Sequence, residues 1–133
     1  MRVLFLYAER FRFRTHHKAL ESAPDDDRDA TVTNAALAFV HAEPNDGAEQ
    51  ETKLVKNLKW VAGKFETKRC VLHYFAHLGE ARLDAELARA LLERARTRLS
   101  GAGYEVVVTP FGHFCDLAMD LPGDSMARVY KAF

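Results

Sequence analysis

Two amphipathic segments of helical length divide the strand-like parts of this chain. Residues 49–65 and residues 83–99 each repeat apolar side chains at spacings of three and four. This periodicity predicts two helices that each bury one face. Ser100–Gly103, with its two glycines, is typical of a helix end and closes the second helix. Helices of this kind need a second layer to cover, so the remaining segments are expected to form a sheet.

Strand-like segments precede, separate and follow the two predicted helices. Most are rich in β-branched and aromatic residues or alternate between apolar and polar ones. The predicted strands are residues 3–8, the second half of residues 31–43, and residues 70–76, 104–109 and 113–120, with a final strand or short helix over residues 125–133. Short turns join the last strands, so part of the sheet is expected to be antiparallel. We predict a single domain over residues 1–133 with an α/β fold, in which two main helices cover one face of a mixed β-sheet.

Composition excludes several classes of protein. Apolar residues make up 48% of the chain and charged residues 29%, which excludes intrinsic disorder and fibrous architectures. Nineteen basic and nineteen acidic residues give a net charge of zero, so any contact with nucleic acid must come from a local patch. Two cysteines are too few for a disulfide scaffold. The apolar stretch at the start is too short for a signal peptide or a membrane span, and we expect a cytoplasmic protein without membrane contact.

The first predicted strand runs from an apolar stretch into a basic one. Residues 3–8 are apolar throughout, which indicates a strand covered on both faces. Beyond them Arg10, Arg12 and Arg14 alternate with two phenylalanines and therefore share one face. The arginines form either the solvent face of an edge strand or, with Lys18, a contact for phosphate groups. Residues 21–30, which include three consecutive aspartates, are predicted to be a flexible, solvated loop without a catalytic role.

Five side chains are of the types that bind zinc: Cys70, His73, His77, His113 and Cys115. If residues 70–77 are extended, His73 and His77 share one face of the strand and Cys70 points the other way. The other two residues are supported only by a His-x-Cys spacing. The pattern favours a buried Cys70 that packs as a small hydrophobic residue, and no metal site is predicted.

Two segments combine a bend with a small residue at the end of a predicted strand: residues 74–78 and residues 110–114. Such segments allow main-chain groups to approach a bound molecule closely. Ligands of α/β sheets tend to bind at strand ends. Composition alone favours core packing for both segments, so the residues themselves leave a core role and a binding role open.

The sequences of these two segments are Phe75-Ala76-His77-Leu78 and Pro110-Phe111-Gly112. Further matching positions are Met1–Leu4, Lys18–Leu20, Ala38–Phe39 and Glu43. On these residues the whole chain resembles the N-terminal editing domain of archaeal threonyl-tRNA synthetases. That domain is similar in fold to D-aminoacyl-tRNA deacylases, so the resemblance implies a D-aminoacyl-tRNA deacylase-like α/β fold.

The resemblance implies hydrolysis of L-seryl-tRNA(Thr), the mischarged product of the synthetase. A synthetic site built for threonine admits serine, because one missing methyl group discriminates by only about 1–3 kcal/mol. The resemblance further implies a homodimer, no cofactor, and a catalytic synthetase domain that acts with this one in cis or in trans. The alternatives are a D-aminoacyl-tRNA deacylase and a non-catalytic module for tRNA binding or dimerisation.

The amino-acid pocket implied by the resemblance consists of Ala42, Tyr74, Phe75, Ala76, His77, Phe111, Gly112, His113, Phe114 and Cys115. Several of these depart from the family pattern. Tyr74 replaces a proline, and residues 113–115 replace tyrosine, tyrosine and lysine. Arg128 falls on a family glutamate by ungapped counting. Of the polar side chains usual in this pocket only His77 remains, and we assign it a supporting catalytic role.

These departures lead to an expectation about where the chemistry resides. Main-chain N–H groups in the two bends are expected to stabilise the oxyanion, whatever the side chains are. The 2′-hydroxyl of the terminal adenosine is expected to orient or activate the attacking water. The acceptor end of tRNA(Thr) is expected to contact Arg10, Arg12, Arg14 and Lys18.

Overall fold

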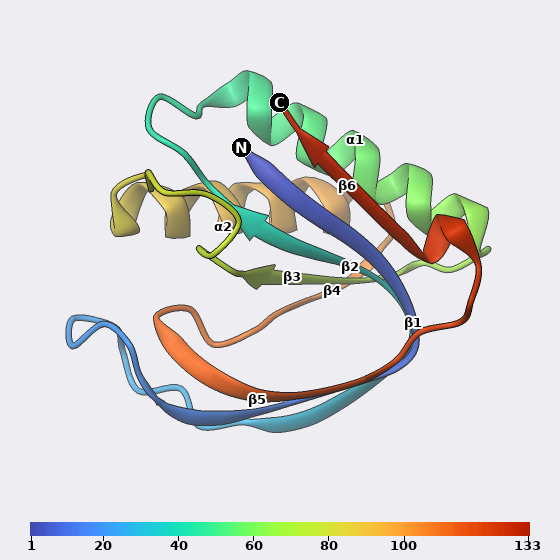
Figure 1. Cartoon of the computed structure of the whole chain (residues 1–133), viewed down its shortest axis with the longest axis horizontal. Coiled ribbons are helices and arrows are strands. Elements are labelled where there is room, and N and C mark those ends of the chain that lie inside the picture. The colour runs from blue at the N-terminus through green and yellow to red at the C-terminus, as the bar shows by residue number, and fades with distance from the viewer.

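The computed structural model describes residues 1–133, which form one six-stranded sheet and two long helices (Figure 1). The strands are β1 (Arg2–Lys18), β2 (Asp29–His41), β3 (Arg69–Tyr74), β4 (Glu105–Val108), β5 (His113–Asp120) and β6 (Arg128–Ala132). The helices are α1 (Ala48–Lys64), α2 (Ala85–Gly101) and the 3-10 turn η1 (Ser125–Ala127). The sheet order is β4-β3-β2-β1-β5, and β6 also pairs with β1. Parallel pairs join β2, β3 and β4 while β1 pairs antiparallel, which confirms the predicted mixed α/β sheet.

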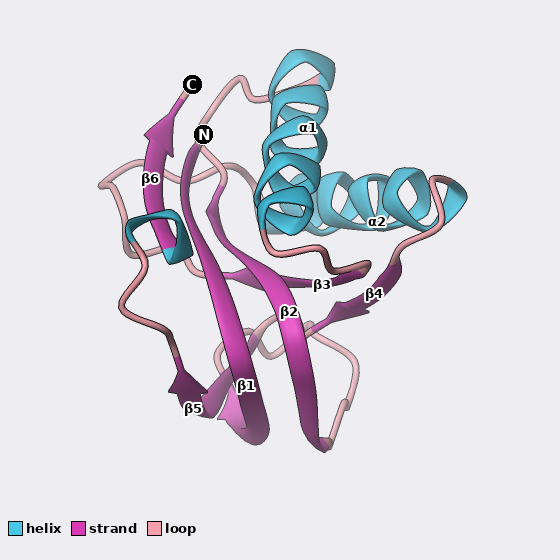
Figure 2. Cartoon of the chain, turned by 90° about the vertical axis from the view of Figure 1, so that its right-hand side faces the viewer, coloured by secondary structure: helices cyan, strands magenta, loops and turns pink.

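Both long helices lie on the same side of the sheet, as Figure 2 shows. Their apolar stripes are buried against it, with Leu58 of α1 and Leu91 of α2 in one core cluster. The Asp84 side chain caps α2 by accepting from two main-chain N–H groups of the first turn. At the other end Gly103 has a φ of 91°, as the predicted glycine stop requires. Neither helix is long and apolar enough to cross a membrane.

The sheet bends in the middle of β1 and β2 (Figure 1). Its far half, which contains β5, residues 10–18 of β1 and residues 29–33 of β2, folds back beneath the near half, which carries the helices. Phe5 faces the helices, whereas Phe11, at the same parity in β1, belongs to a second core cluster. Asn34 of β2, with a φ of 50°, lies in the same bend. Phe11 then meets Phe39 of the near half, with ring centroids 6.4 Å apart. The second cluster therefore fills the space between the two halves of the sheet.

Two details of the predicted strands were wrong. Strand β2 begins at Asp29 and occupies the whole segment rather than its second half. The arginines of β1 do not lie on an edge strand, because β2 and β5 flank this part of β1 on both sides. Ion pairs join β1 to both of these neighbouring strands: Arg12 binds Asp29 of β2 at 2.7 Å, and Arg14 binds Asp116 of β5 at 2.6 Å. The long hairpin thus extends well beyond its apolar segment.

Candidate active site

A cavity of about 330 Å³ lies between the bends that follow β3 and β4. Eight of the ten predicted pocket residues line it: Tyr74, Phe75, Ala76, His77, Gly112, His113, Phe114 and Cys115. Sequence reasoning did not place seven further lining residues in the pocket: Ala19, Leu20, His73, Arg82, Leu83, Ala85 and Leu117. The two bends are therefore brought together, as their positions at strand ends predicted.

The other two predicted pocket residues lie beside the cavity. Ala42 is buried, and its carbonyl oxygen accepts a hydrogen bond from the N–H of Leu83 at 3.0 Å. This bond holds the segment before α2 at the cavity wall. The ring of Phe111 packs against that of Tyr74, with centroids 4.9 Å apart, and lines a neighbouring cavity. Both residues support the site without lining it.

The bend after β4 is fixed by the backbone of Gly112. Its φ is 75°, a region that favours glycine. Its carbonyl oxygen accepts from the N–H groups of Ala19 at 2.7 Å and Leu20 at 3.0 Å. A Cβ atom on this residue would lie 2.7 Å from the Cβ of Ala23. The end of β1 and the bend are thus locked together at a position that only glycine fits.

Main-chain donors remain available in both bends. The N–H groups of Ala76, Phe111 and Gly112 donate to no acceptor within the protein. The neighbouring donors in the first bend are used: the N–H of Phe75 binds Val40, and that of His77 binds the carbonyl of Phe75. The free N–H groups of two cavity-lining residues can therefore donate to an anionic or carbonyl oxygen of a bound molecule.

No carboxylate lines the cavity, so proton transfer by protein groups would fall mainly to imidazoles. His77 is exposed at the cavity, and its ring packs in a T-shaped arrangement with that of Phe75, with centroids 4.9 Å apart. Nδ1 of His113 lies 3.0 Å from the carbonyl oxygen of Phe111. A carbonyl only accepts, so this nitrogen donates, and Nε2 is the ring nitrogen of His113 that stays available to a bound molecule.

Cys115 has no hydrogen-bonded base in the cavity. Burial raises the pKa of its thiol, which disfavours the thiolate needed for nucleophilic attack. The nearest imidazole along the strand, His113, is engaged with a carbonyl group instead. The arrangement does not support a covalent mechanism.

His73 lies deeper than the other imidazoles and is almost completely buried. Its Nδ1 is 2.8 Å from the hydroxyl oxygen of Thr109. Burial lowers the pKa of His73 to about 4, so the ring is neutral at physiological pH. Cys70 lies in the core cluster beneath the helices, on the opposite face of β3, as the alternation predicted. No group of three or more metal-binding side chains is assembled in the molecule.

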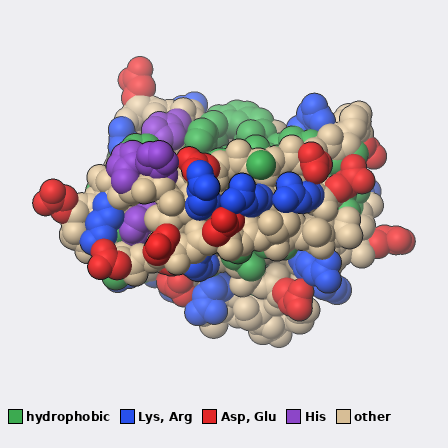
Figure 3. All heavy atoms as spheres, turned by 90° about the horizontal axis from the view of Figure 1, so that it is seen from below, with side chains coloured by type: hydrophobic (Ala, Val, Ile, Leu, Met, Phe, Trp, Pro, Cys, Tyr) green, Lys and Arg blue, Asp and Glu red, His purple; other side chains and the backbone are tan.

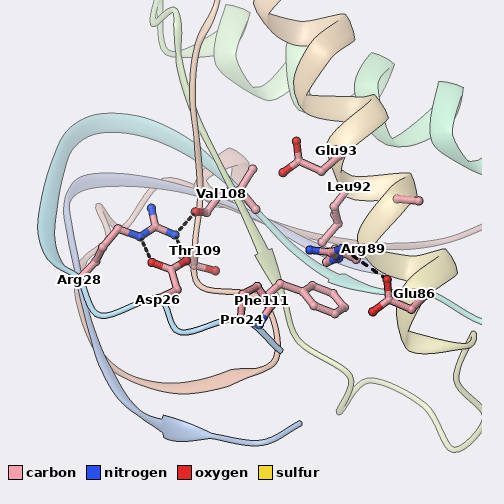
Figure 4. Close-up of a pocket in the computed structure, with 11 residues that line it drawn as sticks. Pro24, Asp26, Arg28, Glu86, Arg89, Leu92, Glu93, Val108, Thr109 and Phe111 are labelled. Carbon is pink, nitrogen blue, oxygen red and sulfur yellow. Dashed lines mark hydrogen bonds and ion pairs between the residues drawn. The ribbon is translucent and has the colours of Figure 1, made fainter. Parts of the chain in front are cut away.

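A second cavity of about 350 Å³ lies next to the first, between α2 and the loop before β2 (Figure 4). Its charged side chains are largely paired with one another. Arg28 binds the carboxylate of Asp26 at 2.7 Å and the carbonyl of Val108 at 2.8 Å. Asp26 of the predicted solvated loop is therefore tied through Arg28 to the end of β4.

The four predicted tRNA contacts follow β1 toward the cavity. Figure 3 shows a row of Lys and Arg side chains on the underside of the sheet, with histidines gathered at one end. Lys18 pairs with Asp25 at 2.7 Å, whereas Arg10 has no carboxylate partner. Arg82, at the cavity itself, also lacks a carboxylate partner. Exposed ion pairs are worth only about 0–1 kcal/mol, so the paired side chains can still exchange toward phosphate.

Two curated proteins are similar to this chain in sequence. A threonine–tRNA ligase of Methanopyrus kandleri is 31% identical over 139 residues, covering 98% of this chain and 22% of the ligase. A threonine–tRNA ligase editing subunit of Aeropyrum pernix is 27% identical and matches 100% of this chain and 32% of its own length. The chain thus spans between about a fifth and a third of the length of these relatives.

Two solved structures share the fold. A c-Myc DNA unwinding element binding protein aligns over 100% of this chain and 99% of its own, with a TM-score of 0.76 and 8% identity. A probable eukaryotic D-amino acid tRNA deacylase covers 99% of this chain and 97% of its own, with a TM-score of 0.53 and 11% identity. The family model for the archaea-specific editing domain of threonyl-tRNA synthetase matches residues 1–133, and the chain belongs to that family.

Proposed function

We propose that this domain hydrolyses the ester bond of L-seryl-tRNA(Thr). The observation that carries the proposal is the cavity between the two bends, which offers free main-chain donors and no carboxylate. The need for such a domain is physical, since a threonine site cannot reject serine by the loss of one methyl group alone. A second pocket that admits serine and excludes the extra methyl of threonine supplies the missing discrimination.

The proposed reaction begins with water attack on the ester carbonyl carbon. The N–H groups of Ala76 and Gly112 stabilise the negative charge that develops on the carbonyl oxygen. The vicinal 2′-hydroxyl of the terminal adenosine orients the water and relays its proton. The new bond joins the water oxygen to the acyl carbon, the bond to the 3′-oxygen breaks, and that oxygen leaves with a proton as the 3′-hydroxyl. Serine and tRNA are the products.

Protein side chains play supporting parts in this proposal. His77 contacts the reacting end at the cavity opening, where it orients the ester rather than acting as the principal base. Arg10, Arg12, Arg14 and Lys18 contact phosphates along β1, which leads directly to the cavity-lining Ala19 and Leu20. No cofactor takes part in these steps.

The partners follow from the same reaction. The tRNA(Thr) acceptor end is the substrate, and a catalytic threonyl-tRNA synthetase domain, joined in cis or acting in trans, produces the mischarged ester. We further propose a homodimer and a cytoplasmic site of action. Light scattering of the purified chain measures the dimer directly, and a strictly monomeric, fully active protein would contradict that part.

A deacylation assay with three substrates tests the function: Ser-tRNA(Thr), Thr-tRNA(Thr) and a D-aminoacyl-tRNA. We expect rapid release of serine and slow release of threonine and of the D-amino acid. Preference for the D-ester would identify a D-aminoacyl-tRNA deacylase instead. Binding of charged tRNA without turnover of any ester would identify a non-catalytic module.

A further inference from the structure

His73 is a buried polar group at the cavity that the proposed reaction does not use. Only 7% of its surface is exposed, and its Nδ1 is engaged by the hydroxyl of Thr109. Its Nε2 has no hydrogen-bond partner in the protein. Every fully buried side-chain nitrogen or oxygen of the molecule has such a partner, so Nε2 is not fully buried. Because His73 also lines the cavity, Nε2 must be the atom that reaches the cavity space.

The surroundings of the ring fix its position and its charge. The ring packs against Phe39, with centroids 4.6 Å apart, and lies near Phe75 at 6.1 Å. Thr109 is itself buried, and its N–H is held by the carbonyl of Leu72, so the hydroxyl is held in place. Burial lowers the pKa of His73 to about 4, which makes the ring a poor proton acceptor at neutral pH.

A neutral imidazole with one free nitrogen is a specific hydrogen-bonding group. If Nδ1 donates to Thr109, then Nε2 accepts; if the Thr109 hydroxyl donates, then Nε2 donates. A hydroxyl group satisfies either state, because it both donates and accepts. An ammonium group satisfies only one of them, and a methyl group satisfies neither.

We propose that Nε2 of His73 binds the side-chain hydroxyl of the esterified amino acid, so that the site selects serine over alanine. The inference rests on the proposed ester hydrolysis and adds a selection for the hydroxyl group to it. An alanyl ester leaves Nε2 buried without a partner once it has displaced water, and that loss is the source of the selection. His73 is thus a specificity residue and not the base.

The test compares kcat/KM for Ser-tRNA(Thr) and for Ala-tRNA(Thr) charged artificially on the same tRNA. The wild-type domain is expected to prefer the seryl ester about tenfold to a hundredfold. His73→Phe keeps a flat ring among the aromatic neighbours. It is expected to lose most of the seryl activity, keep the alanyl activity, and bring the ratio close to one.

Two further variants separate recognition from packing. His73→Gln retains an amide that can reach the same position and is expected to restore part of the serine preference. Thr109→Val leaves the imidazole but removes its partner, and an intermediate preference is expected. Denaturant unfolding of each variant identifies any that fail to fold, and the preference is then judged on the folded ones.

The outcomes separate the proposed ester hydrolysis from the proposed selection of the hydroxyl group by His73. If the wild type hydrolyses both esters at the same rate, the result is compatible with the editing function but refutes the role of His73 in selecting serine. Equal loss of both activities in His73→Phe and His73→Gln would also overturn selection and assign the ring to packing. If the wild type hydrolyses neither L-ester, the proposed function itself fails, and the inference fails with it.

Discussion

Gly112→Ala perturbs the bend that joins the end of β1 to the proposed site. A φ of 75° costs a non-glycine residue about 1–2 kcal/mol. The new Cβ would also lie 2.7 Å from that of Ala23, so the turn over residues 19–23 must shift. That shift strains two main-chain hydrogen bonds to the carbonyl of Gly112, each worth about 0.5–1.5 kcal/mol. We expect the free energy of unfolding to fall by about 2–4 kcal/mol.

The matched control is Gly63→Ala in α1. A Cβ at position 63 meets nothing within 4 Å, and the residue is helical. This substitution is expected to raise stability by about 0.5–1 kcal/mol. Urea denaturation measures both variants, and deacylation measured on the folded fraction should fall about a hundredfold for Gly112→Ala only, because a displaced donor misses the oxyanion. Equal stability and equal activity of the two variants would refute the reasoning.

Three other substitutions test separate parts of the site. Cys115→Ala should retain most deacylation activity, and a loss above about a thousandfold, or about 4 kcal/mol of barrier, would indicate covalent catalysis. His77→Ala should slow deacylation about tenfold in single-turnover assays, whereas loss of the principal base would cost at least about a hundredfold. Because the pKa of His73 falls from 6.5 to about 4 on folding, the unfolded chain binds its proton first as the pH drops. The free energy of unfolding should therefore decrease between pH 6.5 and pH 4, less steeply in His73→Phe, and parallel pH curves for the two proteins would contradict this.

Most elements could be predicted because their local patterns agree with their final environment. The stripe of apolar residues in each helix faces the sheet, and strand β5 has the predicted limits of residues 113–120. Residues 125–133, predicted to form a strand or a short helix, contain both: a short helical turn followed by a strand. The two long helices and β5 each obey one period throughout, so the sequence is sufficient to assign them.

The first part of β2, in the outer half of the long hairpin, could not be predicted as a strand from its local pattern. It is stabilised by cross-strand pairs such as Arg12 with Asp29, and the partner of a charged residue is not visible in its own segment. The sharp bend of the sheet depends on a change of face between Phe5 and Phe11, where simple alternation predicts none. The fold-over of the sheet therefore emerges only from tertiary packing.

The two bends that line the candidate cavity could be predicted from the sequence, whereas the lining residues from other segments could not. The sequence presents His73 only as a candidate zinc ligand, because nothing local reveals that Thr109 engages its ring. Arg82 lies in a loop, and its place at the cavity follows from the bond between Leu83 and Ala42. The signal that could have placed His73 at the cavity is a histidine within a buried strand, next to a bend at the strand end.

The central claim, that main-chain donors and the substrate's own hydroxyl carry the chemistry, has one direct test. Ser-tRNA(Thr) ending in 2′-deoxyadenosine carries a stable 3′-ester, because acyl migration is blocked, and it differs from the normal substrate by one uncharged hydroxyl group. Its phosphate contacts are unchanged, so its binding to the domain should be nearly the same. We predict that single-turnover hydrolysis falls at least about a hundredfold, as expected when the group that handles the proton is removed. Hydrolysis of the deoxy substrate at close to the normal rate would contradict substrate assistance and make His77 the leading candidate for the base.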